Sequence, residues 1–328
     1  MTTLEERVAS MPRGSASAFG ALTAVAVLCC ALATAATAAP APVLRVEGPG
    51  EVLDPGTRYL TGTESLPAAT DSGCRRTSRR HRVAGPTALG LLGSAFESNR
   101  ELRPLGIAAD EFGLRVCRIG THVETDVPFT GWLYRVNHRS PSKGAALKKV
   151  GGRDEVLWYF ANFGNDVNTG DELVVRAPVR ARPGTIEVRV LAFGFDGTAK
   201  PAPDGTVVRG GVAPARVSGG TARVQVRPGE AALRAVRRPD IPSAPVEVCV
   251  SADPGDCPAA RGETIVGTSA GDRIRGTAGA DLIRARAGAD RVDARGGGAD
   301  RVACGPGRDR AVVDARDRAI GCEVKIGP

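Results

Sequence analysis

Regularly spaced aspartates near the C-terminus are the residues of this 328-residue chain whose type and spacing best suit a chemical role. Their intervals are nine, nine, ten and nine residues, and a glycine lies one or two positions before each of them: Asp272, Asp281, Asp290, Asp300 and Asp309. Carboxylate oxygens are the hard ligands that Ca²⁺ prefers. The spacing therefore predicts a repeated calcium-binding turn.

An apolar or small residue follows each aspartate at the second position, which completes a pattern close to the nonapeptide G-G-x-G-x-D-x-U-x. These residues are Ile274, Ile283, Val292, Val302 and Ala311. The segment 262–328 resembles the haemolysin-type (RTX) calcium-binding repeats. The resemblance implies a short parallel β-roll in which two nonapeptides complete one coil around a thin apolar core. Carboxylates about 18 residues apart would then stack as Asp272 with Asp290, Asp281 with Asp300, and Asp290 with Asp309.

The repeats depart from the pattern in ways that weaken an expected cation site. Ala285 and Arg286 occupy positions where the motif has glycine, and residues 262–328 hold 10 acidic against 12 basic side chains. Nearby arginines repel a cation directly. We expect weak binding, with a dissociation constant on the order of 10⁻⁴–10⁻³ M, as in extracellular modules. A roll that holds no ion is the alternative reading.

Cysteine usage and the N-terminus predict export. Residues 1–38 read as a signal peptide, with an A-x-A cleavage site at Ala36–Ala38 and a true start at either Met1 or Met11. Six cysteines follow it: Cys74, Cys117, Cys249, Cys257, Cys304 and Cys322. An even number in an exported chain implies disulfides, and six cysteines allow fifteen pairings. Their placement along the chain favours pairing in sequence order, 74 with 117, 249 with 257, and 304 with 322.

The aromatic residues point to a compact first region over residues 42–163. Pro86–Glu97 has helical spacing, whereas Gly131–Asn137 (GWLYRVN) and Glu155–Phe160 (EVLWYF) alternate as strands do. One helix against a small mixed sheet is an α+β arrangement.

Two motifs in this region, GW-x-Y-x-VN and D-x-V-x-W-Y, resemble those of the transcobalamin-type C-terminal domain found on Gram-positive surface proteins. The resemblance implies a β-grasp-like fold with a face that closes over a corrinoid. Trp132, Tyr134 and Trp158 would then contact the ligand. Packing of the same three side chains in the core is the alternative, and the one we favour.

Residues 168–250 form a second region in which short alternating segments are separated by Gly/Pro turns. Thr185–Val190, Ala222–Arg227 and Pro245–Val250 are examples. The pattern is typical of a β-sandwich. It resembles the immunoglobulin-like modules of bacterial surface proteins, which space or present other domains.

The whole chain therefore predicts a multi-domain, mainly β protein: signal peptide 1–38, β-grasp-like α+β domain 42–163, immunoglobulin-like sandwich 168–250 and β-roll 262–328. Its composition agrees, with 42 Gly, 23 Pro and only 4% aromatics. The three histidines lack ligand spacing, so we expect no enzyme. The basic run 75–82 has no interleaved aromatics, so we expect no nucleic-acid partner.

Two functional hypotheses result. The first is a secreted or cell-surface modular protein that binds Ca²⁺ weakly, with cell-envelope components as candidate partners and no membrane span after signal cleavage. The second is an extracellular binding protein for a small, corrinoid-like ligand. Titration of the first region with cobalamins separates the two.

Overall fold

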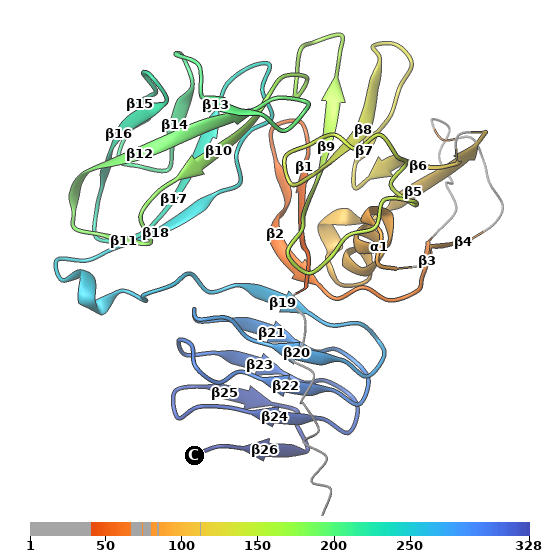
Figure 1. The fold of residues 1–328 in the computed structure, drawn as a ribbon, viewed down its shortest axis with the longest axis vertical. Coiled ribbons are helices and arrows are strands. Elements are labelled where there is room, and N and C mark those ends of the chain that lie inside the picture. Colours follow the sequence, from red (N-terminus) through yellow and green to blue (C-terminus); the bar gives the residue numbers. More distant parts are fainter. Residues whose placement is uncertain (1–40, 67–73, 75–79, 84, 112) are drawn as a thin grey trace, which may run out of the picture. The chain divides into compact units, whose positions relative to one another are not determined.

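The computed structural model describes residues 41–66, 74, 80–83, 85–111 and 113–328 (Figure 1). The predicted signal peptide and most of the basic run 75–82 lie outside these residues. The described chain is mainly β, with several sheets and a single α-helix.

The first region packs helix α1 against one end of a mixed sheet. The helix spans Ala88–Ser98, close to the predicted 86–97, because the Thr87 hydroxyl accepts a hydrogen bond from Gly90 N at 3.0 Å and so caps it. Its buried leucines share a core with Trp132 and Trp158 of the sheet. The sheet strands of this region are β1 (Val43–Glu47), β2 (Val52–Tyr59), β8 (Thr130–Val136) and β9 (Glu155–Asn162).

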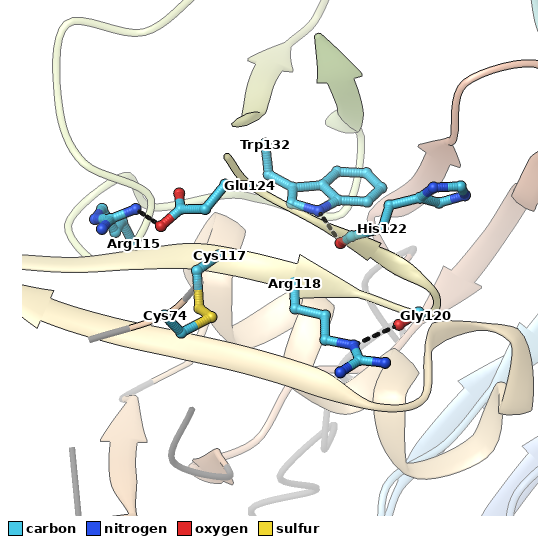
Figure 2. The surroundings of a disulfide bond; sticks show 8 residues. All are labelled: Cys74, Arg115, Cys117, Arg118, Gly120, His122, Glu124 and Trp132. Atoms are coloured by element: carbon cyan, nitrogen blue, oxygen red, sulfur yellow. Dashed lines mark hydrogen bonds and ion pairs between the residues drawn. A yellow bond between two sulfur atoms is a disulfide. The ribbon is translucent and has the colours of Figure 1, made fainter. Parts of the chain in front are cut away.

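Smaller strands complete this region around a disulfide. Strands β5 and β6 form a hairpin, and Cys117 of β6 is bonded to Cys74 (Figure 2). The elements are β3 (Glu64–Leu66), β4 (His81–Val83), the 3₁₀ turn Arg100–Leu102, β5 (Leu105–Asp110), β6 (Gly113–Ile119) and β7 (His122–Val123).

The second region consists of two sheets that share one hydrophobic core, as the alternating pattern predicts. One sheet is built on β12 and the other on β17, and valines and alanines from both are buried between them. The strands are β10 (Glu172–Arg176), β11 (Arg180–Ala181), β12 (Gly184–Phe193), β13 (Ala199–Pro201), β14 (Val207–Arg209), β15 (Ala215–Arg216), β16 (Thr221–Val226), β17 (Gly229–Val236) and β18 (Val246–Val250). A second disulfide joins Cys249 to Cys257.

The C-terminal region is a stack of three-residue parallel strands (Figure 1). They are β19 (Thr264–Val266), β20 (Arg273–Arg275), β21 (Leu282–Arg284), β22 (Arg291–Asp293), β23 (Arg301–Ala303), β24 (Arg310–Val312), β25 (Arg318–Ile320) and β26 (Val324–Ile326). Odd- and even-numbered strands form separate sheets, which is consistent with a β-roll.

The predicted apolar positions of the repeats fill the interior of this roll, and the disulfide Cys304–Cys322 closes its last coils. The sequence did not reveal that β19 also pairs in parallel with β2, so that the roll continues the sheet of the first region.

A buried cluster of charges joins the first region to the sandwich. Arg45 of β1 bonds to Glu47 at 2.9 Å and to Glu172 of β10 at 3.3 Å. Arg234 of β17 bonds to the other Glu47 oxygen at 2.5 Å, and His138 lies 3.0 Å from Glu172. Arg45, Glu47 and Glu172 are at most 1% exposed. Each charge therefore depends on its partners, because water cannot replace them.

Replacing Arg45 with methionine leaves Glu47 and Glu172 short of a buried partner. We expect the free energy of unfolding to fall by about 3–5 kcal/mol, measured by urea denaturation. The matched control is Arg295→Met, which breaks an exposed pair with Asp293 and should lower the free energy of unfolding far less. Equal effects of the two substitutions would contradict the role of the buried cluster.

Candidate calcium site

The acidic side chains of the roll stack in two columns, one along each edge. The first column is Asp281, Asp300 and Asp317, and the second is Asp272, Asp290, Asp309 and Glu323. Glu263 contributes only its backbone N–H, which donates to Asp281 Oδ1 at 2.8 Å, because its carboxylate bonds to Arg58. The three pairs expected from the repeat spacing all lie within these columns. Parallel pairing of β20 with β22 and of β21 with β23 sets the vertical register.

Except in Asp272, one oxygen of each stacked carboxylate accepts a hydrogen bond from the backbone of the acidic residue one coil earlier. Asp290 Oδ1 accepts from Asp272 N, and Asp309 Oδ1 accepts from Asp290 N, both at 2.8 Å. The same bond, also 2.8 Å, joins Asp281 N to Asp300 Oδ1. These bonds fix each carboxylate at a turn and leave its second oxygen for another partner.

That second oxygen is buried and unpartnered in three of the aspartates. Asp290, Asp300 and Asp309 are each 1% exposed, and their Oδ2 atoms have no hydrogen-bond partner among the described residues. A buried anionic oxygen without a partner is costly. A cation at the turns would supply the missing interaction, so these residues fit the Ca²⁺ that the repeat implies.

Two earlier aspartates are better satisfied within the protein. Thr268 N donates to Asp272 Oδ2 at 2.6 Å, and Thr277 Oγ1 donates to Asp281 Oδ1 at 2.8 Å. Threonine stands in both turns where the motif has its second glycine. Of the five predicted ligands, Asp290, Asp300 and Asp309 therefore retain the greatest need for a cation.

Gly276 lies beside two carboxylates of the first column. A Cβ atom there would approach Asp281 Oδ2 to 3.0 Å and Asp300 Oδ2 to 3.6 Å. Glycine thus keeps this turn open between two carboxylates. Among the described residues, no group of three or more His, Cys, Asp or Glu side chains is arranged to hold a metal. Backbone carbonyl oxygens of the turns would have to complete the ligand set, as is usual for Ca²⁺.

Burial and mutual repulsion alter the titration of the columns. Burial, assisted by the charges of Asp281, Asp317 and Asp314, raises the pKa of Asp300 to about 6. Burial also raises the pKa of Asp290, with contributions from Asp272 and Asp309. Negative charge in the columns is therefore under-compensated.

Arg286 places a positive charge and a strained backbone in one of the turns. Its φ angle is 78°, in the left-handed region that glycine adopts without cost. The guanidinium also lowers the pKa of Asp272, although burial of that carboxyl outweighs it and the net shift is upward. This arginine is the departure from the repeat with the clearest structural effect.

Two members of the columns escaped sequence analysis. Asp317 accepts from Asp300 N at 3.0 Å, and Glu323 accepts from Asp309 N at 2.7 Å. They follow Asp309 at eight and fourteen residues, so the nine-residue period is lost. The sequence feature that could have identified them is a carboxylate directly before a short, partly apolar segment.

The aromatic residues singled out in the sequence belong to the first region and not to the roll. Trp132 and Trp158 are buried in the core of the first region, and Tyr134 stacks on Trp158 with ring centroids 5.2 Å apart. The structure contains the three disulfides that sequence order favours. Within the described residues, no helix combines the length and apolarity needed to cross a membrane.

Comparison with known proteins places the repeat motif at this site. Residues 266–302 match the RTX calcium-binding nonapeptide repeat (4 copies). No curated protein and no solved structure matches the chain, and the comparisons gave no support for a transcobalamin-like domain. The match supports calcium binding by the C-terminal region.

The raised pKa of Asp300 predicts an unusual pH dependence without calcium. The unfolded carboxyl titrates near 3.8 and the folded one near 6, so the folded state holds the proton more tightly between these values. Its contribution to stability is therefore present below pH 4 and falls as pH rises to 6. In a chelator, we expect the melting temperature of wild type to fall relative to that of Asp300→Asn between pH 4 and 7. If the difference in melting temperature between the two proteins did not change with pH, the raised pKa of Asp300 would be contradicted.

Proposed function

We propose that this chain is a secreted or cell-surface, non-enzymatic modular protein whose C-terminal repeats bind Ca²⁺ weakly. The unpartnered, buried Oδ2 atoms of Asp290, Asp300 and Asp309 carry the proposal. They need a cation, and the repeat family supplies the reason for choosing Ca²⁺. Bound ions would neutralise the columns and stiffen the coils. Each ion would bind the folded roll in preference to the unfolded chain and so stabilise it.

Export is part of the proposal. The predicted signal peptide and the three disulfides support an oxidising, calcium-rich destination. Weak affinity is sufficient there, because extracellular Ca²⁺ modules have dissociation constants of about 10⁻⁴–10⁻³ M. The roll would then lack bound Ca²⁺ before export and bind it afterwards.

The two preceding regions would present or space other groups, the first as a β-grasp-like unit and the second as an immunoglobulin-like sandwich. A shared hydrophobic core between two sheets supports the sandwich assignment. Corrinoid binding by the first region is the alternative function. It depends on the two aromatic motifs alone, and no contact in the structure favours it.

Calorimetric titration of the full chain with CaCl₂ tests the proposal. We expect saturable binding in the range given above, with a higher melting temperature in Ca²⁺. The double variant Asp290→Asn/Asp309→Asn should weaken binding at least tenfold, since it removes two charges from one column. Asp293→Asn is the matched control, because Asp293 pairs with Arg295 on the outside of the roll. No heat and no melting shift at 10 mM Ca²⁺ would refute calcium binding.

Arg286 offers a gain-of-affinity test. Arg286→Gly removes the left-handed strain and the repelling charge together, so we expect about three- to tenfold tighter Ca²⁺ binding. Arg286→Lys keeps both features and should bind as wild type does. The same titration compares the two variants. Weaker binding by Arg286→Gly would show that the arginine supports the turn.

A further inference from the structure

A pocket of about 250 Å³ opens beside strand β8 of the first region, away from the carboxylate columns. Its lining comes from β6, β8, β9 and the segment 140–145, and Phe195 reaches it from the sandwich. Both tryptophans of the chain, Trp132 and Trp158, take part in the lining. The volume lies below the range of about 300–1,000 Å³ that suits drug-sized ligands. A corrin ring is larger than such ligands, so this pocket is too small to hold it.

The strand that borders the pocket has an open edge. β8 pairs with β9 on one side only, and it ends the order of its sheet. On the other side the two ends of β8 are closed, because Thr130 N donates to Thr125 O at 2.9 Å and Val136 N donates to Arg139 O at 2.8 Å. In an antiparallel pair, every second residue points its backbone groups away from the partner.

Trp132 and Tyr134 lie between these closed ends and share their orientation. Their backbone N–H and C=O groups therefore face away from β9. Within the described part of the chain, no hydrogen bond to these outward groups is present. Two donors and two acceptors thus alternate along an edge that is two outward-facing residues long.

A buried side-chain donor adds to this edge. Trp158 is 2% exposed and lines the pocket, yet its Nε1 has no hydrogen-bond partner among the described residues. The contrast is Trp132, whose Nε1 donates to His122 O at 3.0 Å (Figure 2). A buried indole N–H normally has an acceptor. The free donor of Trp158 therefore calls for an acceptor from a ligand.

We propose that this pocket binds a short extended peptide segment of about three residues with a bulky apolar side chain. The alternating groups of Trp132 and Tyr134 match the hydrogen-bond pattern of an added strand. The pocket receives the apolar side chain, and a peptide carbonyl accepts from Trp158 Nε1. Closure of both ends of β8 limits the pairing to about three ligand residues. Leu133 and Phe195, 38% and 71% exposed, provide an apolar border.

Blocked tripeptides are the probes. Ac-Thr-Phe-Thr-NH₂ and Ac-Thr-Leu-Thr-NH₂ are titrated into the full chain, and binding is followed by tryptophan fluorescence and calorimetry. We expect dissociation constants on the order of millimolar, as three residues offer few contacts. Ac-Thr-Gly-Thr-NH₂ and backbone N-methylated versions should bind at least tenfold more weakly. Measurements with and without Ca²⁺ should agree, which separates this site from the roll.

Two glycines of the first region provide a matched pair of variants. A Cβ at Gly144 or at Gly131 meets no atom within 4 Å, so the first carbon of a new side chain is accommodated equally at the two positions. Only Gly144 lines the pocket. Gly144→Leu should weaken peptide binding at least tenfold, and Gly131→Leu should leave it within twofold of wild type. Trp158→Phe removes the free N–H together with part of the buried ring, and it should weaken binding several-fold.

Several results would overturn the proposal. No binding of any tripeptide at 10 mM would remove the site, and equal affinity in Gly144→Leu and wild type would place binding elsewhere. p-Cresol carries an aromatic ring but no peptide backbone. If p-cresol or the N-methylated peptides bound as tightly as the unmodified peptides, the pocket would be an apolar site that does not use the strand edge.

Discussion

Stacked carboxylates repel one another, and the C-terminal roll brings them together along both edges. Parallel three-residue strands repeat the same position in every coil, so an acidic residue in one turn lies above another in the next. The backbone N–H of each earlier acid satisfies one oxygen and leaves the other buried. The fold therefore creates a demand for positive charge at its turns. Arginines do not meet that demand, because those that follow the aspartates in the strands are exposed.

The rest of the roll compensates only partly for this repulsion. Its core consists of isoleucines, valines, alanines and Cys304, one or two residues per nonapeptide, and contains no aromatic residue among its described members. Pairing of β19 with β2 anchors the first coil to the first region, and the Cys304–Cys322 disulfide closes the last coils. By the chain-entropy estimate, a loop of this size contributes about 3 kcal/mol. The coils between these two anchors depend most on a bound cation.

The sequence predicted the roll well because its signal is local and periodic. Asp, Gly and the following apolar residue recur at a fixed interval, and each unit repeats one backbone conformation. The pairs Asp272–Asp290 and Asp281–Asp300 followed from two units per coil. Asp317 and Glu323 were missed because the nine-residue interval is lost after Asp309. The repeat pattern also could not show which carboxylate oxygens lack a hydrogen-bond partner. That depends on whether a threonine in the same turn donates to the aspartate.

Contacts between residues far apart in the sequence could not be predicted, because they leave no local or periodic signal in it. The buried contacts of Arg45 with Glu172 and of Arg234 with Glu47 join residues more than 120 positions apart. The open edge of β8 likewise appears only when Thr125 and Arg139 are seen to close its two ends. Alternation in GWLYRVN identifies a strand and gives no information about which side of it is paired.

The most direct measurement of the central claim is a crystal structure of the full chain grown in CaCl₂, with anomalous difference maps collected at long wavelength. We expect calcium peaks at the turns, within coordination distance of the free Oδ2 atoms of Asp290, Asp300 and Asp309. Well-ordered turns with no anomalous peak there, and with those oxygens bonded to water or arginine, would contradict it.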